Sequence, residues 1–157
     1  MNIDLVVTGK TNIDFVTLGV ETYCKRLKNY TNFSIITLPD IKNSKSLTFE
    51  LLKNKEGEQM CKILKKYDYV ILLDDKGKEL SSSGFAEWVN KKANMGFRKI
   101  CFVVGGAYGF SKDVYSLANE KVSISKMTFS HQMIRLLFTE QLYRAFTILN
   151  NEPYHHE

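Results

Sequence analysis

The chain has 157 residues, of which 44% are hydrophobic and 25% are charged, and its formal net charge is +5 at pH 7. These values are typical of one globular domain and exclude a collagen-like or intrinsically disordered chain. The positive charge is compatible with an anionic partner such as RNA, although many basic proteins bind no nucleic acid.

The cysteines and the N-terminus predict where the protein works. Cys24, Cys61 and Cys101 lie far apart and form no C-x-x-C motif, which predicts a protein of the reducing cytoplasm. The first ten residues carry an acid at Asp4 and no basic region, so they do not predict a signal peptide. No apolar run approaches the ~20 residues that cross a bilayer, so we expect no membrane span.

Strands and helices are predicted to alternate along the first half of the chain. Residues 3–8, which are rich in apolar and β-branched side chains, predict a buried strand. Residues 15–27 have the apolar spacing of a helix, and residues 33–38 predict a second strand that ends before Pro39. Residues 47–67 predict a helix with an irregularity at Gly57.

The same alternation continues through the second half. A third strand is predicted at residues 69–74, followed by a helix at 81–96 that begins with capping serines and ends at a glycine. The remaining expected elements are a strand at 99–104, a short helix at 112–119 capped by Ser111, a strand at 121–125 and a long helix at 131–149. This order predicts an α/β domain with a mainly parallel sheet and helices on both faces.

Ligands of such sheets bind at the carboxyl ends of the strands, so three segments become candidate binding loops. They are residues 73–82 (LDDKGKELSS), 105–111 (GGAYGFS) and 125–130 (SKMTFS). The second contains G-G-x-x-G, which differs from the dinucleotide fingerprint G-x-G-x-x-G. It is either a tight turn that needs positive φ or a place where the backbone approaches a cofactor closely.

Metal binding and serine hydrolysis are not predicted. His131, His155 and His156 do not combine with cysteines or carboxylates at the spacing of a metal site. The chain also lacks the G-x-S-x-G sequence that presents a nucleophilic serine.

The helix at 131–149 is apolar on nearly every side and must therefore be buried on more than one side. A second copy of the protein could cover one side, or the helix could be the central core helix of a monomer. Glu140 and Arg144 are spaced i,i+4 in the favourable order, which predicts at least a helix-stabilising pair.

Four segments together resemble one known family. They are LDDKGKELSSSGFA, FVVGGAYGF, SISKMTFSHQMIRLLFTEQLYRAF and EPYHHE, and the similarity runs from VVTGK near the N-terminus to the end of the chain. The sequence resembles the RlmH family of ribosomal RNA large-subunit methyltransferases, small members of the SPOUT superfamily. The resemblance implies a homodimer of single domains spanning residues 1–157, each with a trefoil knot within about residues 70–157.

The resemblance also implies an activity and its residues. The family methylates N3 of a pseudouridine in 23S rRNA of the assembled ribosome, with S-adenosylmethionine as methyl donor and no metal. The matching cofactor positions are Leu73, Gly77, Gly105, Ile124, Ser125, Lys126, Met127, Thr128 and Phe129.

On the target side, the matching residues are Arg144, Tyr154 and His155, while His156 replaces a cation that many members carry there. Arg144 is expected to stabilise the pseudouridine anion or grip phosphate, His155 to accept the N3 proton, and Tyr154 to contact the base. The RNA surface is expected to be composite, with scattered basic residues such as Lys25, Arg26, Lys28, Lys91, Lys92 and Arg98.

Two other readings remain open. A ribosome-associated RNA-binding protein of the same fold would need no methyl donor. A nucleotide-binding α/β enzyme of another class, such as a phosphatase or dehydrogenase, is disfavoured because the chain has no Walker motif, metal cluster or G-x-G-x-x-G.

Overall fold

Five parallel strands form one sheet in the order β2-β1-β4-β3-β5 in the computed structural model, which describes residues 1–156. Glu157, the last residue of the expected domain, therefore lies outside the described residues. The strands are β1 (Asn2–Thr8), β2 (Asn32–Leu38), β3 (Tyr69–Glu79), β4 (Lys99–Val104) and β5 (Glu120–Ser123). The helices are α1 (Asp14–Leu27), α2 (Phe49–Leu64), α3 (Ser82–Asn94), α4 (Lys112–Leu117) and α5 (Met133–Leu149), and a 3-10 turn spans Ser44–Ser46.

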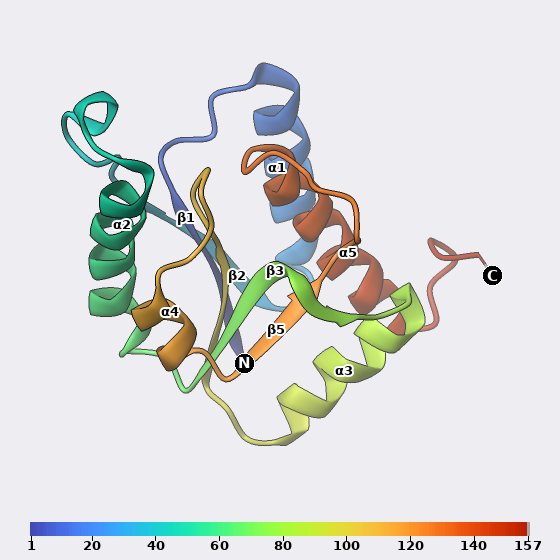
Figure 1. The fold of residues 1–157 in the computed structure, drawn as a ribbon. Helices are drawn as coiled ribbons and strands as arrows, with labels where there is room; N and C mark the ends of the chain where they lie inside the picture. The colour runs from blue at the N-terminus through green and yellow to red at the C-terminus, as the bar shows by residue number, and fades with distance from the viewer. Residues whose placement is uncertain (157) are drawn as a thin grey trace.

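Helices cover both faces of the sheet, as the alternating pattern predicts. Figure 1 shows α1, α3 and α5 on one face and α2 and α4 on the other. The strands bury alternate side chains into two separate cores because successive residues of a strand point to opposite faces. Ile3 and Leu5 of β1 belong to the core beneath α1, α3 and α5, whereas Val6 belongs to the core beneath α2 and α4.

Hydroxyl caps begin three of the helices. The side-chain oxygens of Thr48, Ser81 and Ser111 accept hydrogen bonds from backbone N–H groups in the first turns of α2, α3 and α4. Gly96, two residues after the end of α3, has a φ of +82°, which a glycine adopts without strain. The predicted serine caps of α3 and α4 and this helix end are confirmed, whereas the Thr48 cap of α2 was not predicted.

The irregularity expected at Gly57 is wrong, because α2 continues through it. A Cβ at Gly57 would lie 2.1 Å from Oγ of Ser111, the cap of α4. Gly57 therefore allows α2 and the start of α4 to approach each other closely, and it does not break α2.

The segment 73–82 was expected to be a loop, but most of it is strand. β3 continues to Glu79, and both Leu73 and Lys78 pair with Val122 of β5, so the ladder contains an irregularity between them. A Cβ at Gly77 would lie 2.6 Å from the backbone nitrogen of Val122. Gly77 thus allows the extension of β3 to pass close to the backbone of β5.

Helix α5 packs against α1 and α3 on the sheet, with Phe138, Leu142 and Ala145 fully buried. The chain's own elements therefore cover its inner side, as the core-helix reading requires. Phe15 and Leu18 of α1 remain 63% and 67% exposed. A second copy of the protein stays a prediction.

Lys92 does not belong to a basic surface. It is only 6% exposed, forms an ion pair with Glu120 and donates a hydrogen bond to the Tyr69 hydroxyl at 2.9 Å. The RNA-binding role expected for Lys92 is therefore replaced by a role within the fold.

Within residues 1–156, none of the helices has the length and hydrophobicity needed to cross a membrane.

Candidate active site

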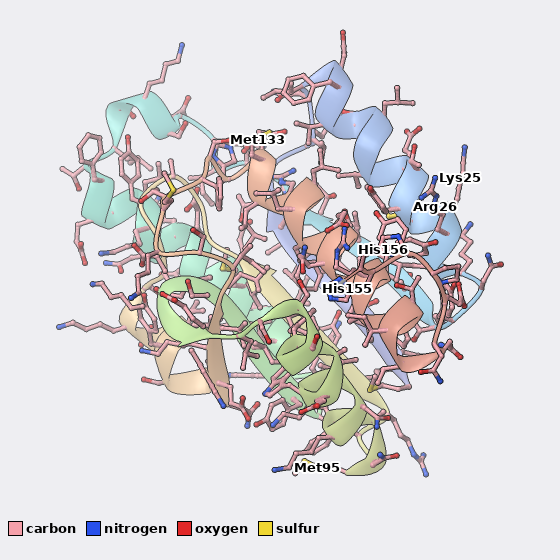
Figure 2. All side chains as sticks on the ribbon, turned by 90° about the vertical axis from the view of Figure 1, so that its right-hand side faces the viewer. Lys25, Arg26, Met95, Met133, His155 and His156 are labelled. Carbon is pink, nitrogen blue, oxygen red and sulfur yellow. The ribbon has the colours of Figure 1, made fainter. Side chains whose placement is uncertain are left out.

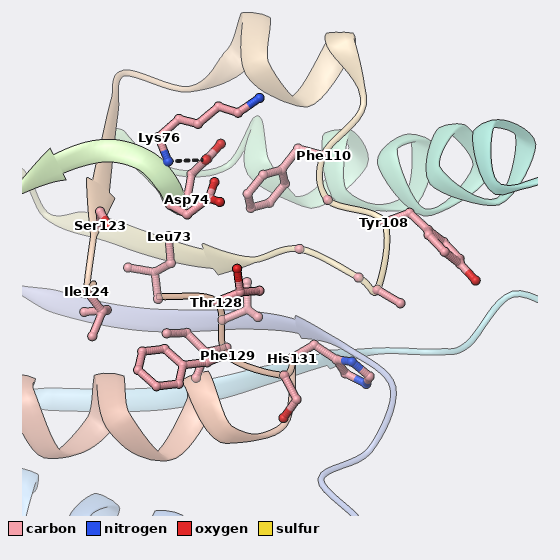
Figure 3. Close-up of a pocket in the computed structure, with 18 of the residues that line it drawn as sticks. Leu73, Asp74, Lys76, Tyr108, Phe110, Ser123, Ile124, Thr128, Phe129 and His131 are labelled. Atoms are coloured by element: carbon pink, nitrogen blue, oxygen red, sulfur yellow. Dashed lines mark hydrogen bonds between the residues drawn. The ribbon is translucent and has the colours of Figure 1, made fainter. Parts of the chain in front are cut away.

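A cleft of about 800 Å³ opens at the carboxyl ends of β4 and β5, beside the middle of β3. Its walls come from residues 73–76, 104–110, 123–125 and 127–131, together with Lys53, Tyr115 and Ile134 (Figure 3). Residues 73–76 lie inside β3, where its pairing with β5 becomes irregular, and the other two segments follow β4 and β5. They converge on one hollow, in the position where α/β sheets bind ligands.

Most of the cofactor positions implied by the resemblance lie in this cleft. Those that line it are Leu73, Gly105, Ile124, Ser125, Met127, Thr128 and Phe129. Gly77 instead faces the backbone of β5. The Lys126 side chain is 84% exposed, with its Nζ 3.9 Å from Oε1 of Glu79, and does not belong to the lining that the structure describes.

The cleft combines an apolar wall with large side chains that are still exposed. Leu73, Val104 and Ile134 contribute apolar surface, while Met127 is 76% exposed and Phe129 39% exposed. Charged and hydroxyl side chains such as Asp74, Lys76 and Ser125 also line the cleft, and apolar surface combined with placed polar groups is typical of small-ligand sites. A heteroaromatic base such as adenine fits this lining, and its binding would bury Met127 and Phe129.

Asp74 supplies a negative charge at the cleft. Burial alone would raise its pKa, but hydrogen bonds from the Tyr115 hydroxyl (2.5 Å) and the backbone N–H of Lys76 (2.9 Å) hold the pKa below its ordinary value. Asp74 is therefore ionised at neutral pH and complements a cation bound in the cleft. From the sequence, Asp74 was placed in a candidate binding loop without a role of its own; its position directly after the buried residues of β3 was the available signal.

The glycine segment after β4 is both a turn and a wall of the cleft. The N–H of Gly109 donates to the carbonyl of Gly106 at 3.1 Å, and Gly109 has a φ of +82°. Gly105, Gly106 and Gly109 all line the cleft. The tight-turn reading is confirmed, and the same turn brings backbone to the site.

Glu56 of α2 lies behind this turn and was missed by sequence reasoning, because one acid in an amphipathic helix resembles its solvated neighbours. A Cβ at Gly106 would lie 2.2 Å from Oε2 of Glu56, so the carboxyl packs directly on the glycine. Within residues 1–156 this oxygen is buried and has no hydrogen-bond partner. Burial, followed by the charge of Asp40, raises the pKa of Glu56.

We expect Glu56→Gln to stabilise the protein at pH 8 relative to the parent but not at pH 4. The pKa of Glu56 is higher in the folded protein than in the unfolded chain. Its contribution to the free energy of unfolding is therefore complete below the unfolded-state pKa and is lost as the pH rises through the folded-state pKa. Urea unfolding at several pH values measures the difference in the free energy of unfolding between the variant and the parent. Glutamine does not titrate, so the variant lacks the pH dependence that the Glu56 carboxyl group contributes. An equal difference at pH 4 and pH 8 would contradict the assignment, and Glu58→Gln on the exposed side of α2 is the control.

The target-side residues form a second group at the other end of α5. Arg144 donates from Nε and Nη2 to Oε1 of Glu140, at 3.1 and 2.6 Å, and its Nη1 lies 3.2 Å from Nδ1 of His155. The Tyr154 hydroxyl donates to the same Glu140 oxygen at 3.0 Å, and the guanidinium lies over the Tyr154 ring at 4.7 Å. We call Glu140, Arg144, Tyr154 and His155 the tail cluster.

Charge in the tail cluster is well defined. The hydrogen bond from Arg144 to Glu140 raises the pKa of the guanidinium, so Arg144 is a permanent cation. Burial, then hydrogen bonds with Tyr23 and Glu140, raise the pKa of Tyr154, so its hydroxyl keeps its proton. The pair expected at Glu140 and Arg144 is confirmed and is part of a larger network.

The tail that carries the cluster is fastened to the body of the protein. The Tyr30 hydroxyl donates to Oε2 of Glu152 at 2.6 Å, and the Tyr23 and Tyr154 hydroxyls lie 3.2 Å apart. The Glu152 N–H donates to the carbonyl of Thr147 at 2.9 Å. These contacts hold the tail beside α1 and the end of α5 (Figure 2).

The tail cluster and the cleft are separate within one chain. None of Arg144, Tyr154 and His155 lines the cleft. Ile134 lines it, and Arg144 follows ten residues later, which is about 15 Å along the helix axis. One chain therefore carries both groups of residues without bringing them to the same point.

Comparison with known proteins agrees with these features. A family model described as "Predicted SPOUT methyltransferase" matches residues 1–155. Proteins named "Ribosomal RNA large subunit methyltransferase H" are similar along the whole chain. That of Parabacteroides distasonis is 53% identical and that of Flavobacterium johnsoniae 52% identical, each over 157 residues and the full length of both chains. That of Christiangramia forsetii is 50% identical over 156 residues, 99% of each chain.

Two solved structures share the fold at low sequence identity. TrmJ from Z. mobilis ZM4 is 9% identical with a TM-score of 0.50, over 99% of this chain and 72% of that one. A putative methylase family protein from Neisseria gonorrhoeae is 13% identical with a TM-score of 0.51, over 99% of this chain and 86% of that one. The family model and the full-length relatives together decide the assignment: the chain belongs to the SPOUT methyltransferase family.

Proposed function

We propose that the protein transfers a methyl group from S-adenosylmethionine to N3 of a pseudouridine in 23S rRNA of the assembled ribosome. Membership of a methyltransferase family and the names of the full-length relatives support the reaction and the RNA. The observation that carries the proposal is the cleft at the carboxyl ends of β4 and β5, beside the middle of β3, where an apolar wall meets the ionised Asp74.

The residues of the cleft fit the methyl donor. When bound, S-adenosylmethionine supplies a methyl group activated on a cationic sulfur. Leu73, Ile124 and Phe129 offer apolar surface to its adenine, and the Asp74 carboxylate complements its positive charge. The backbone of the glycine turn closes one side and helps to exclude water.

The tail cluster offers the groups that the target base needs. The N3 proton of pseudouridine is weakly acidic, and a nearby cation favours its loss. We assign Arg144 to stabilising the N3 anion, His155 to accepting the proton and Tyr154 to contacting the base through its ring or hydroxyl. Glu140 orients Arg144 and Tyr154 because it accepts from both.

Homodimer formation would complete the active site. The tail cluster lies away from the cleft of its own chain, so a second copy is needed if the two groups are to act on one base. The exposed Phe15 and Leu18 offer apolar surface for that contact. We further propose that residues 1–157 form a single domain whose knot lies within about residues 70–157; the convergence of three segments from this part of the chain on one cleft supports it.

Mass spectrometry of 23S rRNA tests the function. Cells without this protein should lack one N3-methylated pseudouridine, and the parent gene should restore it. Calorimetry should show one S-adenosylmethionine bound per cleft. A non-catalytic RNA-binding protein of this fold would leave the rRNA modification unchanged, and that result would refute the proposal.

A further inference from the structure

A second cavity of about 780 Å³ lies at the carboxyl ends of β1 and β2 and has no role in the function proposed above. His131 lines both hollows, so this second cavity adjoins the cleft at the residues that precede α5. Its volume falls within the range of about 300–1,000 Å³ found for small-ligand sites. The side chains that matter for its chemistry are those of Thr8, Lys10, Asn12 and Asp40.

The wall of the second cavity is held in place by two buried side chains from the α5 side. The Gln132 side chain donates to the carbonyl of Lys10 at 3.0 Å and accepts from the N–H of Asn12 at 3.1 Å. Arg135, 1% exposed, donates to the carbonyls of Thr8 and Gly9, at 2.7 and 2.9 Å. The segment after β1 is therefore fixed before any ligand arrives, which lowers the entropic cost of binding.

The second cavity also contains an unsatisfied polar group. Thr8 is 7% exposed, and within residues 1–156 its hydroxyl is buried without a hydrogen-bond partner. Buried hydroxyls in folded proteins are almost always hydrogen-bonded, so this one marks a position for a ligand atom or an ordered water.

The charged side chains around the second cavity indicate which class of ligand it binds. The guanidinium of Arg135 lies behind the cavity wall, and among residues 1–156 no carboxylate approaches it within ion-pair distance. Together with the exposed Lys10 it makes the cavity attractive to an anion. Asp40, whose carboxylate packs against Gly9 and whose charge acts on Arg135, opposes a bare anion but accepts hydrogen bonds from hydroxyl or amino groups. A nucleotide combines the phosphate and the donors that this arrangement fits.

We propose that the second cavity binds a nucleotide of the RNA strand that flanks the methylated pseudouridine. The phosphodiester lies toward Lys10, and Asp40 accepts a hydrogen bond from the ribose 2′-hydroxyl or a base N–H group. The Thr8 hydroxyl and the Asn12 amide complete the contacts. The inference rests on the proposed function, because the adjoining cleft is where the target base is methylated.

Steady-state methylation of ribosomes from cells that lack the protein tests the inference. Lys10→Ala and Asp40→Asn should each raise KM for ribosomes about tenfold, since one lost contact is worth roughly that factor. The kcat and the affinity for S-adenosylmethionine should stay within about twofold of the parent values because neither residue lines the cleft. Lys66→Ala removes an exposed charge before β3, at the opposite edge of the sheet, and should leave KM unchanged.

Two further arms identify the occupant. A benzophenone side chain at position 12 should crosslink to rRNA next to the methylated pseudouridine; crosslinks only to a second copy of the chain, or to distant rRNA, would overturn the inference. Calorimetry with nucleoside 5′-monophosphates tests whether the cavity binds a free nucleotide instead of a nucleotide of the rRNA. Micromolar binding of a monophosphate, together with an unchanged KM for ribosomes in the Lys10 and Asp40 variants, would also overturn the inference. If the parent protein does not methylate ribosomes, the proposed function is wrong and the inference is wrong with it. If the parent methylates ribosomes and the Lys10 and Asp40 variants have the same KM as the parent, only the inference about the second cavity is wrong.

Discussion

Replacing Arg144 with alanine should lower the single-turnover rate of ribosome methylation by about 100- to 1,000-fold, the usual effect of removing one group that stabilises transition-state charge. The structure shows a guanidinium whose pKa is raised by Glu140 and which lies against His155 and the Tyr154 ring. If this cation favours the N3 anion, its loss removes stabilisation that no neighbouring group replaces. The affinity for S-adenosylmethionine should change by less than about twofold, because Arg144 does not line the cleft.

Two variants make this result interpretable. Arg144→Lys keeps the charge but loses the planar fork that reaches Glu140 through two nitrogens, so its rate should fall between those of the parent and the alanine variant. Lys66→Ala removes an exposed cation just before β3, outside the basic residues expected to contact RNA and at the opposite edge of the sheet from the cleft, and should methylate at the parent rate. A parent-like rate for Arg144→Ala, in protein whose thermal unfolding is unchanged, would remove Arg144 from the mechanism.

Arg135→Met should destabilise the protein by about 3 kcal/mol, as measured by the urea dependence of unfolding. Two effects oppose each other. Methionine relieves the desolvation of a buried cation, whose pKa is lowered by its burial. It also leaves the carbonyls of Thr8 and Gly9 and the hydroxyl of Thr11 without their charged donor. Each abandoned buried acceptor costs about 1–3 kcal/mol, so the second effect is larger.

The control for Arg135 uses the same change at an exposed position. Arg98→Met should alter the free energy of unfolding by less than about 0.5 kcal/mol, as is usual for surface substitutions. Arg135→Lys keeps one charged donor and should lose less stability than Arg135→Met. Equal stability of Arg135→Met and the parent would show that the carbonyls after β1 find water or other donors.

The order of strands and helices was predictable because it depends on local patterns of apolar residues and on caps. The extension of β3 was not, because the polar sequence after Asp74 reads as a loop, and only pairing with β5 makes it a strand. Gly57 was misread for the same reason: its role depends on Ser111, which lies far away in the chain.

The site was predictable where a sequence motif is continuous and unpredictable where distant segments meet. The resemblance pointed to Leu73, Gly105 and the segment after β5, and these residues lie together at the cleft. It did not indicate Glu56 or Tyr115, which come from elements outside the motifs. The burial of Arg135 was equally hidden, since its carbonyl partners belong to the other end of the sequence.

The hydrogen bond between Tyr30 and Glu152 bears on how fast a working enzyme can assemble. A tail that stayed free until two chains met would lose about 1–2 kcal/mol of backbone entropy for each residue ordered at that moment. Because Tyr23 and Tyr30 already hold it, that loss belongs to folding and not to association. In the homodimer proposed above, two chains would therefore dock as rigid bodies, without waiting for a terminal segment to find its conformation.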